Sequence, residues 1–556
     1  MSCSQVQLDS RELPRVSGPT PSWLTCRTFL GILILPQLFC TAAQLSVDVL
    51  DETGQSLPCR ALARSSDGTC HTPVSAVVLE IGPDRWFYTD GSFELDVPTG
   101  ELELRVEHGL EFRRYKQRFH IDDQGARKSI VLKRWIDMKQ RGYLCADNHL
   151  HVDSRSVGAM AISEGLDFAS SLTWWDGPDP ERPVPPGHGA SRILEFSGRK
   201  IIASIHDAEL EENWGAVYVQ NMPHPWPLES DKRRPNLDYL KYAVAQGAIV
   251  HYQGGWSREV GLDALLGLVH TVNVCNNNFH MHRFQPRRRY SNLLEVIGFP
   301  DYPETEEGMM RMNTETYYRL LNWGLRLAAG AGSATGVKQV PVGYNRAYIK
   351  VDPAATLDQF YDTWRAGHNF VTNGPMVLLT GPEGESPGDA ISLEKPTDKL
   401  GFHVRVFSDQ PLQSVEIVQD GKVVKEFSVT DEQEADHRFQ IPVLQSGWLA
   451  ARATAFDDLL SDEELQIYDD DPRQRPSRLR FAHTSPIYLS VNGKPPGVSG
   501  SIEEGLLMLD QLESFAKRQA HANRLEDITR EITLGRAILN KRLDEKREMS
   551  LEPSEQ

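Results

Sequence analysis

Alternating apolar and polar residues dominate the first part of the chain after residue 43. The stretch QLSVDVL places Leu45, Val47 and Val49 on one side of an extended strand, because side chains i and i+2 of a strand share a face. A turn signal, Asp90-Gly91, separates two further alternating runs. The pattern predicts a β-sandwich over residues 44–138.

Between residues 139 and 372, apolar runs alternate with segments able to form helices. The strand-like runs include GYLCADNHLHV, KIIASIHDAEL, AIVHYQGG and HTVNVCNNN, and the helix-like segments include NLDYLKYAVAQG and TETYYRLLNWG. Strand and helix in alternation predict a mainly parallel sheet, which some folds close into a barrel. In such folds, ligands bind at the carboxyl ends of the strands.

The pattern returns to alternation in the next segment. LGFHVRVF and SVEIVQDGKVVKEFSV, with a hairpin signal at Asp420-Gly421, predict a second β-sandwich over residues 373–498. Residues 499–556 have helical periodicity instead. Ser501 and Glu504 are spaced as a capping box, which predicts the start of a helix there.

The first 43 residues have the pattern of a signal peptide with an N-terminal extension. Arg27 precedes the apolar run TFLGILILPQLF, and the small-residue stretch CTAAQ follows, so we expect cleavage after Ala42 or Ala43. The apolar run is shorter than the ~20 residues that span a bilayer. We therefore expect an exported protein, periplasmic or extracellular, with no stable membrane span after cleavage.

The net charge and the cysteines indicate which partners and which disulfides to expect. The formal net charge of −18 argues against broad electrostatic binding to nucleic acid. Cys59 and Cys70 lie close together in a turn-rich stretch, and export permits disulfides, so we predict that they pair. We expect Cys145 and Cys275 to be small buried hydrophobic residues.

The candidate chemistry lies in the middle segment, at the ends of the strand-like runs. His149 and His151 in ADNHLHV share a strand face and therefore project the same way. Further imidazoles and carboxylates follow along the chain: His206, Asp207, Glu209, His251, His280 and His282. Imidazole and carboxylate together suit zinc, manganese or iron, so we predict a divalent metal site.

These motifs resemble, in order and spacing, those of the PHP-type metallohydrolases (the polymerase and histidinol phosphatase superfamily). ADNHLHVDS resembles their opening motif, Gly-Asp-x-His-x-His-Ser, and AIVHYQGG resembles the strand that ends in a ligand histidine. The most similar branch is labelled CehA/McbA and contains carbamate- or amide-cleaving hydrolases. The resemblance covers the chain from residue 44 to about residue 500. It implies a central α/β PHP-like (β/α) barrel flanked by the two β-sandwiches.

The sequence departs from the family pattern at several ligand positions. Trp174 and Trp175 replace an Asp-His pair, Ala216 replaces a histidine, and Ala334 replaces the aspartate of Gly-Ser-Asp. The ligands that the resemblance retains are His149, His151, Glu209 and His251, and the residues able to compensate are His206, Asp207, His280 and His282. The site is expected to hold fewer metals than a full one, a differently placed set, or none.

Two functions remain open from the sequence. The first is an exported metal-dependent hydrolase, in which a metal-bound hydroxide attacks an amide, carbamate, ester or phosphoester, and Asp207 transfers a proton. The second is a degenerate PHP-like binding protein with adhesion-like sandwiches, which keeps a pocket for a carbohydrate or another ligand. Tryptophans of the middle segment, Trp174 and Trp175 among them, are expected mostly in the core; in the binding protein they could form an aromatic wall.

Overall fold

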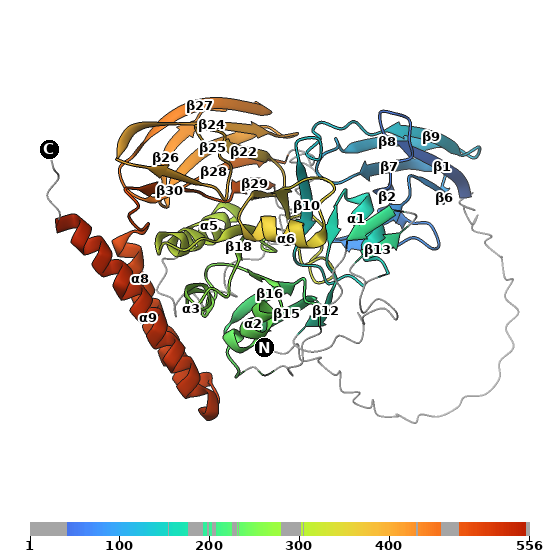
Figure 1. Ribbon diagram of the computed structural model, residues 1–556. Coiled ribbons are helices and arrows are strands. Elements are labelled where there is room, and N and C mark those ends of the chain that lie inside the picture. The colour runs from blue at the N-terminus through green and yellow to red at the C-terminus, as the bar shows by residue number, and fades with distance from the viewer. Residues whose placement is uncertain are drawn as a thin grey trace, which may run out of the picture. The chain divides into compact units, whose positions relative to one another are not determined.

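The fold is that of a computed structural model, which describes residues 42–153, 155–175, 193–196, 199–202, 207–224, 231, 233–279, 302–303, 305–429, 432–457 and 478–551. Within these residues the protein is multidomain and rich in β-sheet, with seven α-helices (Figure 1). The expected signal segment lies outside the described residues, except for Ala42 and Ala43, which begin the first strand. No described helix is long and apolar enough to cross a membrane.

The N-terminal segment is all-β, as the alternation predicts. Its strands are β1 (Ala42–Leu50), β2 (Cys59–Ser65), β3 (Cys70–His71), β4 (Val78–Ile81), β5 (Asp84–Thr89), β6 (Ser92–Pro98), β7 (Gly100–Glu107), β8 (Tyr115–Ile121) and β9 (Ala126–Val131). One sheet has the order β6-β1-β9, and the other has the order β4-β5-β2-β7-β8, with β3 beside β2. Leu45 and Val47 of the first sheet share a buried cluster with Phe87 and Leu104 of the second. Gly91 forms the predicted turn with φ of 105°.

The predicted Cys59–Cys70 disulfide is wrong, because both thiols are free. Cys70 in β3 pairs with Arg64 of β2, five positions along that strand from Cys59. A strand advances about 3.3 Å per residue, so the two cysteines are several times farther apart than the 4.4–6.8 Å between Cα atoms that a disulfide allows. Although Cys59 and Cys70 are close in sequence, the register of β2 and β3 does not bring them opposite each other.

The middle segment contains most of the helices. Its strands are β10 (Tyr143–Asp147), β11 (Phe168–Ala169), β12 (Leu172–Trp175), β13 (Ile193–Phe196), β14 (Arg199–Ile202), β15 (Asp207–Glu212), β16 (Gly215–Gln220), β17 (Ile249–Tyr252), β18 (Thr271–Cys275), β19 (Ala328–Ala331), β20 (Arg346–Lys350) and β21 (Asn369–Thr372). Its helices are α1 (Val157–Ser163), α2 (Asn236–Ala245), α3 (Val260–Leu265), α5 (Glu306–Asn322) and α6 (Leu357–Arg365). Helix α2 covers most of the expected segment NLDYLKYAVAQG, and α5 includes most of TETYYRLLNWG but begins eight residues before it.

These strands divide between two sheets. A six-stranded sheet has the order β12-β15-β16-β17-β18-β19, with three parallel and two antiparallel pairings. The remaining strands, β10, β11, β13, β14, β20 and β21, belong to a twelve-stranded sheet. The pairings of the described strands therefore show mixed sheets, and they do not show the closed barrel that the resemblance implies.

The C-terminal segment contains the strands of the second predicted sandwich. They are β22 (Met376–Thr380), β23 (Ala390–Leu393), β24 (Thr397–Phe407), β25 (Leu412–Gln419), β26 (Lys422–Phe427), β27 (Glu434–Val443), β28 (Gly447–Phe456), β29 (Leu479–Thr484) and β30 (Ile487–Val491). β22, β24 and β27 form a three-stranded sheet. The predicted Asp420-Gly421 hairpin joins β25 to β26, and both turn residues have positive φ, as a type I′ turn requires.

The twelve-stranded sheet crosses the predicted boundary at residue 373. Its order is β13-β14-β11-β10-β20-β21-β29-β28-β25-β26, with β23 and β30 joined to β28 through β30. The crossing point is the antiparallel pairing of β21 with β29, in which Phe370 lies opposite Thr484. The middle and C-terminal segments are therefore connected through one hydrogen-bonded sheet.

Two long helices end the described chain, α8 (Ser499–Gln519) and α9 (Ala522–Leu551), and they pack against each other as a hairpin (Figure 1). The predicted capping box at Ser501 is wrong. The helix begins three residues earlier than a capping box at Ser501 would place it, after Val498, whose carbonyl accepts from the N–H of Ile502. Ser501 lies inside the first turn, where its carbonyl accepts from the indole N–H of Trp323.

Candidate metal site

The loop that follows β10 carries His149 and His151, and a buried carboxylate fixes it. Asp147, the last residue of β10, accepts hydrogen bonds from the backbone N–H groups of His149 (3.0 Å), Ser333 (3.0 Å) and Gly343 (2.8 Å). Burial raises the pKa of Asp147 to about 6, against the opposing effect of these donors. The carboxylate thus ties the histidine loop to the segment after β19.

The backbone of that second segment runs beside the histidines. The carbonyl of His149 accepts from the N–H of Ala334 (2.7 Å), and the N–H of His151 donates to the carbonyl of Thr335 (2.8 Å). Gly332 lies so close that a Cβ there would approach the Cβ of His149 to 2.6 Å. Ala334, at the position of an expected aspartate ligand, has φ of 58° and contributes a backbone contact here.

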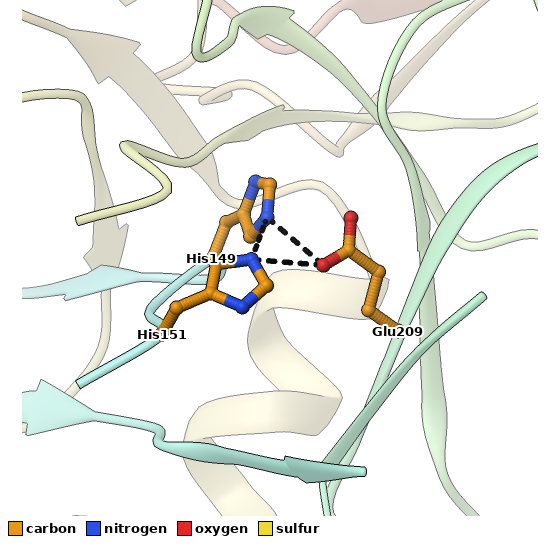
Figure 2. A group of neighbouring side chains, drawn as sticks. All are labelled: His149, His151 and Glu209. Carbon is orange, nitrogen blue, oxygen red and sulfur yellow. Dashed lines mark hydrogen bonds and ion pairs between the residues drawn. The ribbon is translucent and has the colours of Figure 1, made fainter. Parts of the chain in front are cut away.

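The two imidazoles and Glu209 of β15 converge on one point (Figure 2). The Nε2 atoms of His149 and His151 are 2.9 Å apart, and Oε2 of Glu209 lies 3.3 Å from the first and 2.9 Å from the second. All three residues are buried, with exposed fractions of 2%, 4% and 2%. Three groups of these types, gathered this closely, could hold a metal ion.

The three atoms lie at hydrogen-bonding separations, slightly closer than the ligands of a bound ion, and a cation could contact all three of them. With bonds of 2.0–2.2 Å, the ligands of a tetrahedral zinc ion lie about 3.4 Å from one another. A single hydrogen-bonding proton can lie between only one pair of the three atoms, whereas a cation contacts all of them. Two histidines and one glutamate also leave a fourth position, which catalytic zinc sites keep for water or substrate.

Electrostatics favours the ligand forms of these side chains. Burial lowers the pKa of His149 to about 4, although the carboxylate of Glu209 opposes the shift. Burial by itself would raise the pKa of Glu209, but the imidazoles of His149 and His151 outweigh it and hold the pKa below its usual value. At neutral pH, His149 is therefore neutral and Glu209 is ionised, which are the forms that bind metals.

Aromatic rings lie against both imidazoles. The ring of Trp175 in β12 is 4.6 Å from that of His151, between centroids. Tyr218 in β16, directly opposite Glu209, has its ring 4.0 Å from that of His149. Sequence reasoning singled out Trp175 but missed Tyr218, for which the only signal was an aromatic residue within the buried run GAVYVQ.

His251 does not join the group, although it was expected to. It lies opposite Tyr218, which lies opposite Glu209, so the three side chains share one face of the six-stranded sheet. Two strand spacings separate the backbones of Glu209 and His251, roughly 10 Å. The Nδ1 atom of His251 is 2.7 Å from the hydroxyl of Thr271, and its ring is 4.8 Å from that of Trp364. Its Nε2 atom has no hydrogen-bond partner among the residues that the structure describes.

Of the other predicted site residues, Asp207 is described and three histidines are not. Asp207 is fully buried at the start of β15, two residues before Glu209, and its carboxylate accepts from the N–H of Asn221 (3.0 Å). It is not part of the three-residue group. His206, His280 and His282 lie outside the described residues.

Buried amides support the same region. Asn148, between the ligand loop and β10, exchanges two hydrogen bonds with Asn273 of β18, at 2.8 and 3.0 Å. Asn345 donates to the carbonyls of Asn276, Phe279 and Gly332.

No protein-family model matches the chain, and comparison with curated proteins gave no match either.

Proposed function

We propose that the protein is a metal-dependent hydrolase in which His149, His151 and Glu209 hold one divalent ion. The observation that carries this proposal is the convergence of their three ligating atoms within 2.9–3.3 Å in a buried position. A set of two histidines and one glutamate occurs in zinc hydrolases that leave the fourth position open. Zinc is the ion we expect, and manganese and iron suit the same ligands.

When bound, the ion would supply a Lewis acid that lowers the pKa of a coordinated water. The protein would contribute the orientation of the ligands, through the hydrogen bonds of Asp147 and the backbone around Ala334. Asp207 is our candidate for proton transfer. It shares a strand face with Glu209 at a distance of roughly 6.6 Å along the strand, so one or two water molecules could connect the two sites.

The proposed substrate is a small molecule with an amide, carbamate, ester or phosphoester bond. The resemblance of ADNHLHVDS and AIVHYQGG to motifs of the PHP superfamily, and of its CehA/McbA branch in particular, supports hydrolysis of this kind. Trp175, which is partly exposed, would offer aromatic surface beside the imidazole of His151 to an aryl or sugar group. Export remains part of the proposal, on the signal-like pattern of residues 1–43.

A second candidate is a binding protein that has kept the pocket and lost turnover. His251 favours it, because this retained histidine stands apart from the group. Trp174 and Trp175, in place of an Asp-His pair, favour it as well. Such a protein would bind a carbohydrate or another small ligand against the aromatic rings.

Metal analysis of the wild type and of His149→Ala separates the two candidates. For the hydrolase we expect one divalent ion per chain in the wild type, and hydrolysis of at least one substrate in a screen of aryl esters, anilides, carbamates and phosphoesters. His149→Ala should lose the ion and the activity together. His120→Ala, which removes an exposed histidine of β8, should keep both and serves as the control.

The contrary results are equally specific. Wild-type protein that binds no divalent ion, or His149→Ala protein that keeps it, would contradict the metal site itself. A stoichiometric ion without hydrolysis of any substrate class would favour the binding protein.

A further inference from the structure

A second site lies far along the chain from the histidines, beside the helical hairpin. The loops that precede β28 and α8, together with Lys546 of α9, line a cavity of about 410 Å³. Among its lining residues are Ser446, Asn492, Lys494 and Ser499. None of the described residues that line it is acidic.

Lys546 is buried in the wall of this cavity without a partner. Its exposed fraction is 8%, and its ammonium Nζ atom has no hydrogen-bond partner and no ion pair among the described residues. Burial lowers the pKa of Lys546, and the charge of Asp420 opposes the shift. A buried ammonium group without an acceptor costs free energy, because the hydrogen bonds it made to water are not replaced.

The start of α8 faces the same cavity. Gly497, Val498 and Ser499 all line it, and the helix begins at Ser499. No side chain in the described part of the chain caps this end, and no acidic residue occupies the first turn. The first N–H groups of an α-helix have no partner within the helix, and they form the positive end of its dipole, so a 21-residue helix offers here a favourable place for an anion.

We propose that this cavity binds the phosphate group of a small organic phosphate ester. The phosphate would accept hydrogen bonds from the ammonium group of Lys546 and from the N–H groups at the start of α8, which have no partner within the helix. The cavity exceeds the size of a phosphate ion, and Pro396, Leu444 and Val491 add apolar surface for the organic part. Lys494 contributes a second positive charge.

Binding of two probes, phenyl phosphate and inorganic phosphate, tests the proposal by calorimetric titration. The titrations use the His149→Ala background, so that the histidine site cannot bind the probes through a metal. We expect one phenyl phosphate per chain, bound several-fold more tightly than inorganic phosphate. Equal affinity for both probes would overturn the assignment to an ester, and absence of binding would overturn the site.

Variants then locate the bound anion. Lys546→Met, in the same background, should weaken binding about tenfold or more, as expected for the loss of a charged hydrogen bond. Lys541→Met removes a lysine of the same helix with a side chain 78% exposed, and should leave binding unchanged. Equal binding by the Lys546→Met and Lys541→Met proteins would overturn the proposal.

Ser499→Asp keeps the test decisive if Lys546→Met fails to fold. An aspartate in the first turn favours a helix, so this variant should be at least as stable as its parent. Its carboxylate would compete with the phosphate for the same N–H groups, and binding should weaken about tenfold or more. Unchanged phosphate binding by a folded Ser499→Asp protein would contradict the role of the helix.

Discussion

The buried carboxylate of Glu209 and the buried pair Glu259 and Asp263 lie on opposite faces of the six-stranded sheet, and their pKa values are shifted in opposite directions. Glu209 shares its face with Tyr218 and His251, whereas Tyr252, the neighbour of His251 in β17, points to the other face. There the hydroxyl of Tyr252 donates to Asp263. Burial is complete or nearly so in both groups, so it cannot by itself explain their difference.

The neighbours of each carboxylate explain it. Glu209 lies against two imidazoles, which hold its pKa below the usual value. Burial raises the pKa of Asp263 to about 8, and burial together with the carboxylate of Asp263 raises that of Glu259 far above its usual value. Glu259 accepts from the N–H groups of Asn236 (2.7 Å) and Leu237 (3.3 Å), at the start of α2. The ionised carboxylate of Glu209 thus suits the binding of a cation, whereas Glu259 stabilises the start of α2.

The largest effect is expected on metal affinity, when Glu209 is replaced. Glu209→Gln keeps the size of the side chain but removes the anionic ligand, so metal affinity should fall at least about a hundredfold, more than the loss of an outer hydrogen bond to a metal ligand costs. Metal content after dialysis against a metal buffer measures the change. Glu211→Gln, an exposed position of the same strand, is the matched control and should keep the ion. Equal affinities of the two variants would show that Glu209 is not a ligand.

The second prediction uses the same type of substitution on the opposite face. Glu259→Ala would leave two buried N–H groups without an acceptor and should cost about 3 kcal/mol in the free energy of unfolding. Glu259→Gln should cost less than about 1 kcal/mol, because the protonated carboxyl group that it replaces is nearly isosteric and the amide oxygen still accepts. Urea denaturation of both variants measures this difference. A large cost for Glu259→Gln would mean that Glu259 is ionised in the folded protein.

The third prediction concerns pH. The pKa of Asp263 is raised from 3.8 to about 8 on folding, so between these values the folded state retains a proton that the unfolded state releases. Stability from this group therefore falls as pH rises from about 4 to about 8, and it is constant above that range. Asp263→Asn removes the effect and should gain stability relative to the wild type, rising from about 2 kcal/mol at pH 5 to about 5 kcal/mol at pH 8. A difference between the two urea midpoints that stays constant with pH would contradict the shift.

Local patterns predicted the elements of the fold and part of the site. The alternation of β1, the Asp420-Gly421 turn and the periodicity of α5 each depend on neighbours within a few residues. The pair His149 and His151 was equally local, because a spacing of two residues places both side chains on one face. The structure confirms that Glu209 meets this pair.

Local patterns could not predict which distant strands pair, or in which register. Whether His251 reaches Glu209 depends on the order of β15, β16 and β17, which inserts Tyr218 between them. The disulfide prediction was wrong for a more local reason, since the register of the hairpin formed by β2 and β3 places Cys70 opposite Arg64 and not opposite Cys59. The twelve-stranded sheet, which joins strands on both sides of residue 373, likewise depends on strand pairing across long separations in the chain.

The pairing of β21 with β29 also bears on how the chain folds. Thr372 lies opposite Ala482, so roughly a hundred residues of chain form a loop that must close before these two strands meet, and pairings of such high contact order form slowly. Until β29 arrives, one edge of β21 has unpaired backbone groups that can associate with another chain. A protein truncated near residue 373 would expose that edge permanently, and we expect such fragments to aggregate.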